Sequence, residues 1–107
     1  MQEKVLTLLG FASKSGNLIF GFDAAKAACL SGKQAKLIVT ASDLSEKTKK
    51  EISYFAAKAN VAVIHLPFDM ETVSRATGRK GGILCVKDAG FANAIKGGIA
   101  NGKNENQ

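Results

Sequence analysis

Four short apolar runs, each separated from the next by a helical segment, most constrain how this chain can fold. The runs lie at residues 18–20, 37–39, 61–64 and 83–86. Glycine, proline or polar residues bound each run, which is typical of a short buried strand. Strands that alternate with helices pack as a sheet between helical layers. The sequence therefore predicts an α/β fold, a three-layer α/β/α sandwich with a central mixed, mostly parallel sheet of about four strands.

Helices are predicted before, between and after these strands. Apolar residues at helical spacing indicate a helix over residues 3–12, and the alanine-rich segment 22–31 favours a second. Further helices are expected after Ser45, Asp69 and Asp88, because such side chains accept hydrogen bonds from the free N–H groups of a first turn.

A chain of 107 residues suits a single domain with one buried core. We expect this domain to cover residues 1–97, and the glycine- and asparagine-rich residues 98–107 to be a disordered polar tail. Seven apolar side chains of the strands are expected to be buried: Leu37, Ile38, Val39, Val63, Ile64, Leu84 and Val86.

The chain has no feature expected of a secreted or membrane-spanning protein. No apolar run approaches the roughly 20 residues that span a bilayer, and residues 1–4 do not begin a signal peptide. Cys29 and Cys85 lie far apart in apolar surroundings, as small buried thiols do in a reducing compartment. A cytoplasmic protein without membrane contact is expected.

The charge balance points to a polyanionic partner. Fifteen Lys and Arg residues stand against nine Asp and Glu, which gives a net charge of +6. A small basic domain attracts nucleic acid. The alternative is a solvated surface with an excess of lysine.

Residues for catalysis are hard to find. His65 is the only histidine, ends an apolar strand and has no defined acid or nucleophile partner, which favours a structural role. The two cysteines have no zinc spacing, and no catalytic or nucleotide-binding motif is present. Asp43, Asp69 and Asp88 each precede a helix, and capping explains them. The sequence therefore predicts neither an enzyme nor a cofactor or metal site.

Basic side chains in loops are the better candidates. Lys14 precedes the first strand, Lys36 precedes the second, and Arg79 and Lys80 lie in the glycine-rich loop 78–82, which we expect to be flexible. Glycine lets a phosphate or base approach the backbone, and the flanking cations supply charge. The lysines of the third helix alternate with glutamates, which is typical of a solvated helix face.

Residues 9–88 resemble the ribosomal protein L-seven-Ae family, most closely its short bacterial members of the YlxQ type. The resemblance lies in Gly-Phe-Ala-Ser-Lys-Ser-Gly at 10–16, in Gly21 before a helix, and in the run 35–50. In that run, Ala-Ser-Asp followed by Ser-x-x-Thr-Lys-Lys is most specific. The resemblance implies a three-layer sandwich, and many members bind kink-turn RNA, a sharply bent helix–internal-loop–helix element.

The resemblance also implies a site, formed by the start of the second helix and the adjacent loop before the last strand. The family's Gly-Thr-Asn-Glu-x-x-Lys pattern is not kept, because Asp23, Ala24 and Ala27 stand at its polar positions. Phe22 can stack on a base or belong to the core. Together with the basic loops, the candidate RNA-binding residues are Lys14, Gly21, Phe22, Asp23, Lys26, Lys36, Arg79, Lys80 and Gly81.

The leading hypothesis is an RNA-binding protein for structured, kink-turn-like RNA, and association with the ribosome would fit it. The alternative is a protein–protein interaction module that keeps the fold but has lost kink-turn recognition. Its alanine-rich second helix, residues 24–28, would then pack on a partner helix. A small-molecule-binding α/β domain is a third hypothesis, but the chain lacks a phosphate-binding motif.

Overall fold

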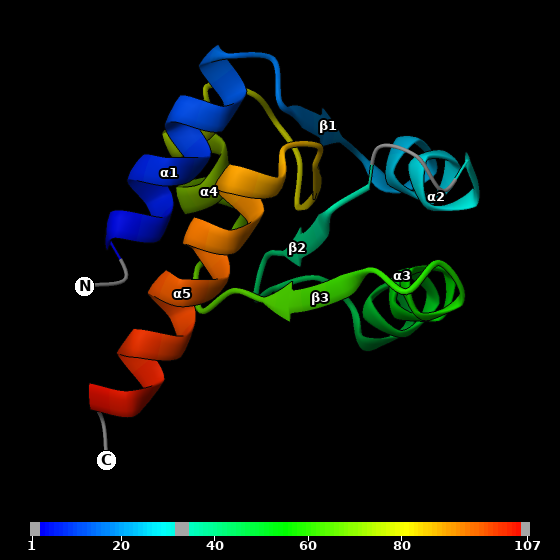
Figure 1. The fold of residues 1–107 in the computed structure, drawn as a ribbon. Helices are drawn as coiled ribbons and strands as arrows, with labels where there is room; N and C mark the ends of the chain where they lie inside the picture. The colour runs from blue at the N-terminus through cyan, green and yellow to red at the C-terminus, as the bar shows by residue number, and fades with distance from the viewer. Residues whose placement is uncertain (1–2, 32–34, 106–107) are drawn as a thin grey trace.

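The computed structural model describes residues 3–31 and 35–105, with side chains described through residue 99. Helices and strands alternate along the chain as predicted (Figure 1). Their order is α1 (Glu3–Lys14), β1 (Leu18–Phe20), α2 (Phe22–Ser31), β2 (Leu37–Thr40), α3 (Glu46–Lys58), β3 (Ala62–His65), α4 (Met70–Thr77), β4 (Ile83–Val86) and α5 (Ala89–Glu105).

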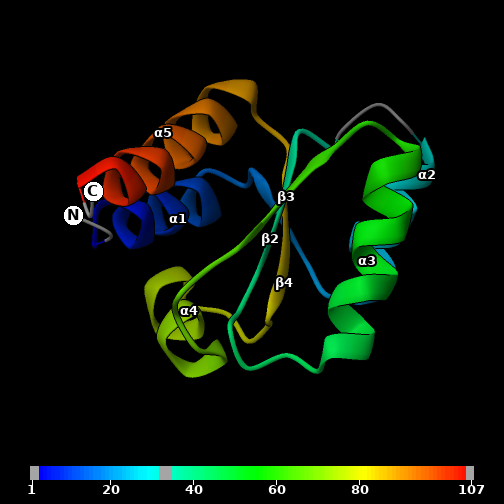
Figure 2. The ribbon, with the colours of Figure 1, turned by 90° about the horizontal axis from the view of Figure 1, so that it is seen from below.

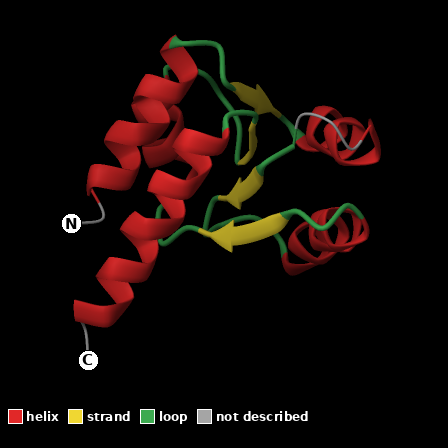
Figure 3. Cartoon of the chain, in the orientation of Figure 1, coloured by secondary structure: helices red, strands yellow, loops and turns green. Residues whose placement is uncertain are grey.

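The elements form the predicted three-layer sandwich. The four strands of the described sheet lie in the order β1-β4-β2-β3. Seen along the sheet in Figure 2, α1, α4 and α5 cover one face, and α2 and α3 cover the other. Figure 3 shows the same strands between two groups of helices.

The sheet is mixed, as predicted, but the prediction that it is mostly parallel is wrong. Only β2 and β3 pair in parallel, whereas β4 runs antiparallel to both of its neighbours, β1 and β2. The reason is the path of α4. Gly82, just before β4, lies against the first residue of α4, so that an added Cβ would come 2.9 Å from Met70 Cγ. The chain therefore enters β4 at the end of the sheet where β3 stops.

The core has two parts, one on each face of the sheet. Leu37 and Val39 belong to the part beneath α1, α4 and α5, and Ile38 points to the part beneath α2 and α3. Of the seven side chains predicted to be buried, all but Val63 and Ile64 are buried, and these two are half-buried. They are partly open because β3 is an edge strand, with a neighbour on one side only.

Three predicted helix caps are confirmed. Ser45, Asp69 and Asp88 each accept a hydrogen bond from the backbone N–H three residues later, at 3.1, 2.8 and 2.8 Å. Asp43 was also expected to cap the helix that follows it, and that prediction is wrong. Its Oδ1 instead accepts from the N–H of Met70, the first residue of α4, at 2.9 Å. Asp43 therefore ties the end of β2 to a helix 27 residues away in the chain.

The folded domain extends past residue 97, where we expected it to end. An added Cβ on Gly98 would come 2.9 Å from Val5 Cγ2, and Ile99 packs against the core. Ile99 packs there because it continues the apolar face of α5. Residues 106–107, and side chains from residue 100 onward, lie outside the described residues, as does that part of the predicted tail. No helix of the described chain, α5 included, combines the length and hydrophobicity needed to cross a membrane.

The two cysteines are buried free thiols, as predicted. Cys29 of α2 and Cys85 of β4 both lie in the part of the core beneath α2 and α3. Burial raises the pKa of the Cys85 thiol to about 11 and also raises that of Cys29. Both side chains are therefore neutral at physiological pH.

Candidate nucleic-acid interface

The turn from β1 into α2 leaves an open backbone at the start of a helix. Gly21 makes this turn with φ +102°, a conformation that favours glycine. Its N–H donates to the carbonyl of Ile83 at 2.9 Å, and its own carbonyl accepts from the N–H of Ala25 at 3.0 Å. No atom lies within 4 Å of the place a Cβ would take. A ligand can therefore approach the main chain here.

The loop between α4 and β4 lies beside this turn, and Phe20 joins the two. The guanidinium carbon of Arg79 lies 4.4 Å from the centroid of the Phe20 ring. Gly81 packs on the same ring, where an added Cβ would come 3.4 Å from Phe20 Cδ2. The side chains of Arg79 and Lys80 are exposed. We call the residues Gly21, Asp23, Arg79, Lys80 and Gly81 the α2–loop surface.

Hydrogen bonds hold the loop that we expected to be flexible. The Thr77 hydroxyl donates to the carbonyl of Arg79 at 3.1 Å, and the carbonyl of Thr77 accepts from the Ser13 hydroxyl at 2.8 Å. The N–H of Gly81 donates to the Ser74 hydroxyl at 3.4 Å. The loop backbone is thus anchored to α1 and α4, while its cations stay in solvent.

The other predicted residues of α2 divide between two faces. Asp23 is exposed in the first turn, next to Gly21. Phe22 is half-buried and packs against the core beneath α2 and α3, which favours a core role over base stacking. Lys26 Nζ lies 4.6 Å from the ring centroid of Phe55 in α3. Of the three, only Asp23 belongs to the α2–loop surface.

The two remaining predicted lysines lie outside this surface. The N–H of Lys36 donates to the carbonyl of Val86, at the end of the sheet where β4 finishes. Gly21 bonds to Ile83, where β4 begins, about 10 Å away at the usual rise of a strand. Lys14 is exposed at the end of α1 and lines a groove between α1 and α4. Lys36 is therefore separate, and Lys14 flanks the surface.

Two aromatic residues near the surface escaped the sequence analysis, which weighed charge and glycine. Phe20 was assigned only to a strand, although its ring supports Arg79 and Gly81. Phe11 is 55% exposed on α1. The sequence did contain a signal for Phe11, because this residue lies outside the apolar stripe of α1 that packs against the core.

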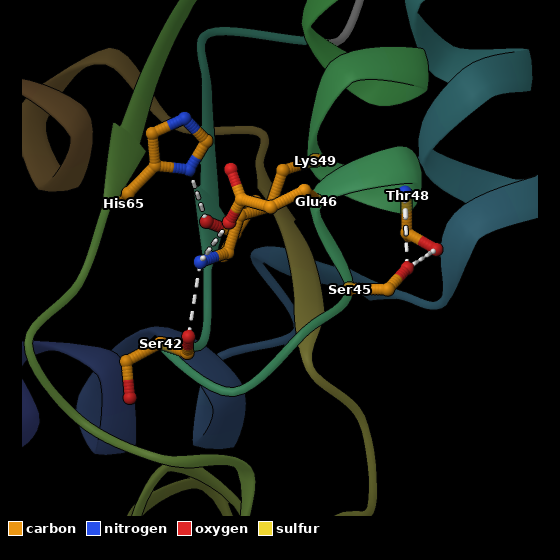
Figure 4. A network of polar contacts seen from close by, with 7 residues as sticks. Ser42, Ser45, Glu46, Thr48, Lys49 and His65 are labelled. Atoms are coloured by element: carbon orange, nitrogen blue, oxygen red, sulfur yellow. Dashed lines mark hydrogen bonds and ion pairs between the residues drawn. The ribbon is translucent and has the colours of Figure 1, made fainter.

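A second polar cluster lies at the other edge of the sheet (Figure 4). His65 Nδ1 lies 2.6 Å from the hydroxyl of the buried Thr40, its partner in the parallel pair β2–β3. Lys49 Nζ donates to the carbonyl of Ser42 at 2.9 Å and pairs with the Glu46 carboxylate at 3.5 Å. The contact with Thr40 supports the structural role predicted for His65.

The four-stranded mixed sheet between two helical layers is the fold of a known class of α/β proteins. The chain belongs to the Ribosomal protein L7Ae/L30e/S12e/Gadd45 family, whose sequence model matches residues 3–96. The predicted family resemblance is therefore confirmed. The chain is 28% identical over 95 residues to the RNA-binding protein YlxQ of Enterococcus faecium, covering 89% of this chain and 90% of that protein.

A solved structure shows the same fold. It is that of a protein of unknown function from Bacillus halodurans, which matches with a TM-score of 0.85 and 28% sequence identity. The match covers 91% of this chain and 97% of that one.

Proposed function

We propose that this protein binds structured RNA of the kink-turn class through the α2–loop surface. The observation that carries the proposal is the position of Arg79, held over Phe20 beside the open turn at Gly21. An exposed cation next to an open backbone turn at a helix start suits a phosphate-rich ligand. The role is one of binding rather than catalysis.

Charge supports the proposal. Among the described residues, neither Arg79 nor Lys80 forms an ion pair, so both can contact phosphates. The net charge of +6 attracts RNA over a longer range. Family membership and the relative named as an RNA-binding protein point the same way.

Asp23 bears on which RNA is bound. Its carboxylate is exposed in the first turn of α2, where it can accept hydrogen bonds from the edge of a guanine. A kink turn presents such edges in its sheared G·A pairs. The side chains of Ala24 and Ala27 can donate no hydrogen bond, so recognition rests on Asp23, on the backbone at Gly21 and on the loop.

The salt dependence of binding tests the proposal. The double variant Arg79→Ala with Lys80→Ala should weaken binding to a kink-turn RNA and flatten the plot of log affinity against log salt by up to about two units. Stability should change by only about 0–1 kcal/mol, because exposed charges contribute little. Fluorescence anisotropy titrations at roughly 50 to 200 mM KCl measure the slope of log affinity against log salt.

The matched control lies on α3. Lys47 and Lys50 are also exposed, so Lys47→Ala with Lys50→Ala removes the same charge from another face. A larger loss of affinity from the control than from the loop variant would place the binding face elsewhere.

Substitutions at the start of α2 test the other half of the surface. Gly21→Val should reduce RNA binding, provided that circular dichroism shows a folded protein. Asp23→Asn with Ala24→Glu and Ala27→Lys restores the family's polar pattern and should raise affinity for kink-turn RNA. Unchanged binding by folded Gly21→Val would exclude this edge, and no gain from the triple variant would point to a different RNA.

A protein–protein interaction module is the second candidate. The observation that favours it is Leu30 of α2, which is 66% exposed. Binding through such an apolar side chain is far less sensitive to salt than binding to phosphates.

Co-sedimentation with ribosomal subunits and fractionation of cells test the ribosome association and the cytoplasmic location that belong to the RNA proposal.

A further inference from the structure

An exposed aromatic ring lies next to the α2–loop surface, on the outer side of α1. Phe11 is 55% exposed, whereas Val5, Leu9 and Ala12, on the opposite side of α1, are buried in the core. Phe11 lines a groove of about 310 Å³ between α1 and α4. Lys14 stands one helical turn further along the same wall. The groove thus combines an apolar ring with a cation.

Cations surround the C-terminal end of α4. Arg75, Arg79 and Lys80 line a neighbouring hollow, and the one acidic side chain there, Glu71, lies 3.3 Å from Arg75. The C-terminal end of a helix carries a partial negative charge that stabilises nearby cations. Together with Lys14, these side chains form a positive rim around the last turn of α4.

The last turn of α4 connects the groove with the loop of the α2–loop surface. Ala76 lines the groove, and the next residue, Thr77, accepts from the Ser13 hydroxyl of α1 at 2.8 Å. The Thr77 hydroxyl donates to the carbonyl of Arg79 at 3.1 Å, and Arg79 lies over Phe20. The groove and the loop cations therefore lie at the same end of α4.

We propose that the groove between α1 and α4 binds an unpaired nucleotide of the RNA, with its base stacked on Phe11 and its phosphate at Lys14. This inference rests on the proposed function. Proteins that hold single-stranded RNA combine aromatic rings, on which bases stack, with cations that follow the backbone. The site would extend recognition from the folded RNA to a single-stranded segment beside it.

Tyr54 of α3 shows what sets Phe11 apart. It is 58% exposed, but Lys58 Nζ lies 5.0 Å from its ring centroid and the Phe55 ring meets it edge-on at 5.3 Å. Within the described part of the chain, the Phe11 ring has no such aromatic or cationic contact. A free ring face bordered by positive charge suits a base with its phosphates better than it suits an apolar protein segment.

The experiment compares kink-turn RNAs of three designs by fluorescence anisotropy. The first design has blunt stems. The second carries a tail of six uridines, placed on one stem and then on the other. The third carries an abasic tail of equal charge at the same places. The uridine tail should tighten binding about tenfold over the blunt RNA, as one stacked base does. The abasic tail should give only the part of the gain that phosphates supply.

Protein variants then separate stacking from charge. Phe11→Leu should remove the advantage of the uridine tail over the abasic tail, and Tyr54→Leu, of nearly equal exposure, should keep it. Lys14→Ala should reduce the gain from both tails by a larger factor than it reduces binding of the blunt RNA.

The outcomes distinguish this inference from the proposed function. If the blunt RNA binds but neither uridine tail exceeds its abasic equivalent, or if Phe11→Leu keeps the advantage, the stacking site is wrong and the proposed function stands. If no kink-turn RNA binds, the proposed function fails. A free twelve-uridine strand then decides the inference: preference over an abasic strand that depends on Phe11 supports it, and no such preference overturns it.

Discussion

The close approach of α1 and α4 can be tested with a single methyl group. Gly10 lies where the two helices meet, and an added Cβ would come 2.9 Å from the carbonyl oxygen of Ala76. The obstructing atom belongs to the backbone, so no rotamer change relieves the contact. Gly10→Ala therefore requires α4 to move by a few tenths of an ångström, as close packing dictates.

Two opposing terms set the sign of the effect. Alanine stabilises a helix interior by about 0.5–1 kcal/mol relative to glycine, whereas overpacking a tight contact destabilises by about 1–3 kcal/mol. We expect a net loss of about 1 kcal/mol for Gly10→Ala. Gly97→Ala in α5 is the matched control, since no atom lies within 4 Å of its added Cβ. It should stabilise the protein by about 0.5–1 kcal/mol.

Urea unfolding followed by circular dichroism measures both variants. With a slope of about 1–3 kcal/mol per molar urea, a difference of about 2 kcal/mol separates their midpoints by roughly 1 M. Their melting temperatures should differ by roughly 10 °C. If Gly10→Ala is as stable as Gly97→Ala, the two helices do not approach as closely as the structure indicates.

Three further predictions concern stability. Ile38→Ala should lower the free energy of unfolding by about 2–5 kcal/mol, and Val63→Ala by less, because Val63 is half-exposed on the edge strand; urea titration compares them. Asp43→Ala should lower it by about 1 kcal/mol, because the N–H of Met70 loses its acceptor. Stability should fall as pH rises from 9 towards 11, since the unfolded Cys85 thiol ionises near 9.0 and the folded one near 11; Cys85→Ala should show a smaller fall across this range.

Local patterns in the sequence were enough to place the helices, strands and most caps. A strand needs only a short apolar run between turn residues, and the N-cap at Ser45 needs only a hydroxyl beside its own helix. The same patterns identified Ile38 and the other central-strand residues as core, because continuous apolar runs indicate burial on both faces. Family motifs within residues 9–88 added the expectation that the start of α2 and the last loop lie side by side.

Contacts between distant residues decided the rest. Whether β4 runs parallel or antiparallel depends on where α4 delivers the chain, and Asp43 meets its partner only because α4 begins beside the end of β2. The position of Arg79 over Phe20 and the groove beside Phe11 arise in the same way, from elements brought together by packing. The periodicity of a segment reports which of its faces is buried, but not which element covers that face. For that reason the sequence alone determined the layers, the ends of most helices and the candidate residues of the α2–loop surface. Only the tertiary structure determined how those residues lie around Phe20 and beside the groove at Phe11.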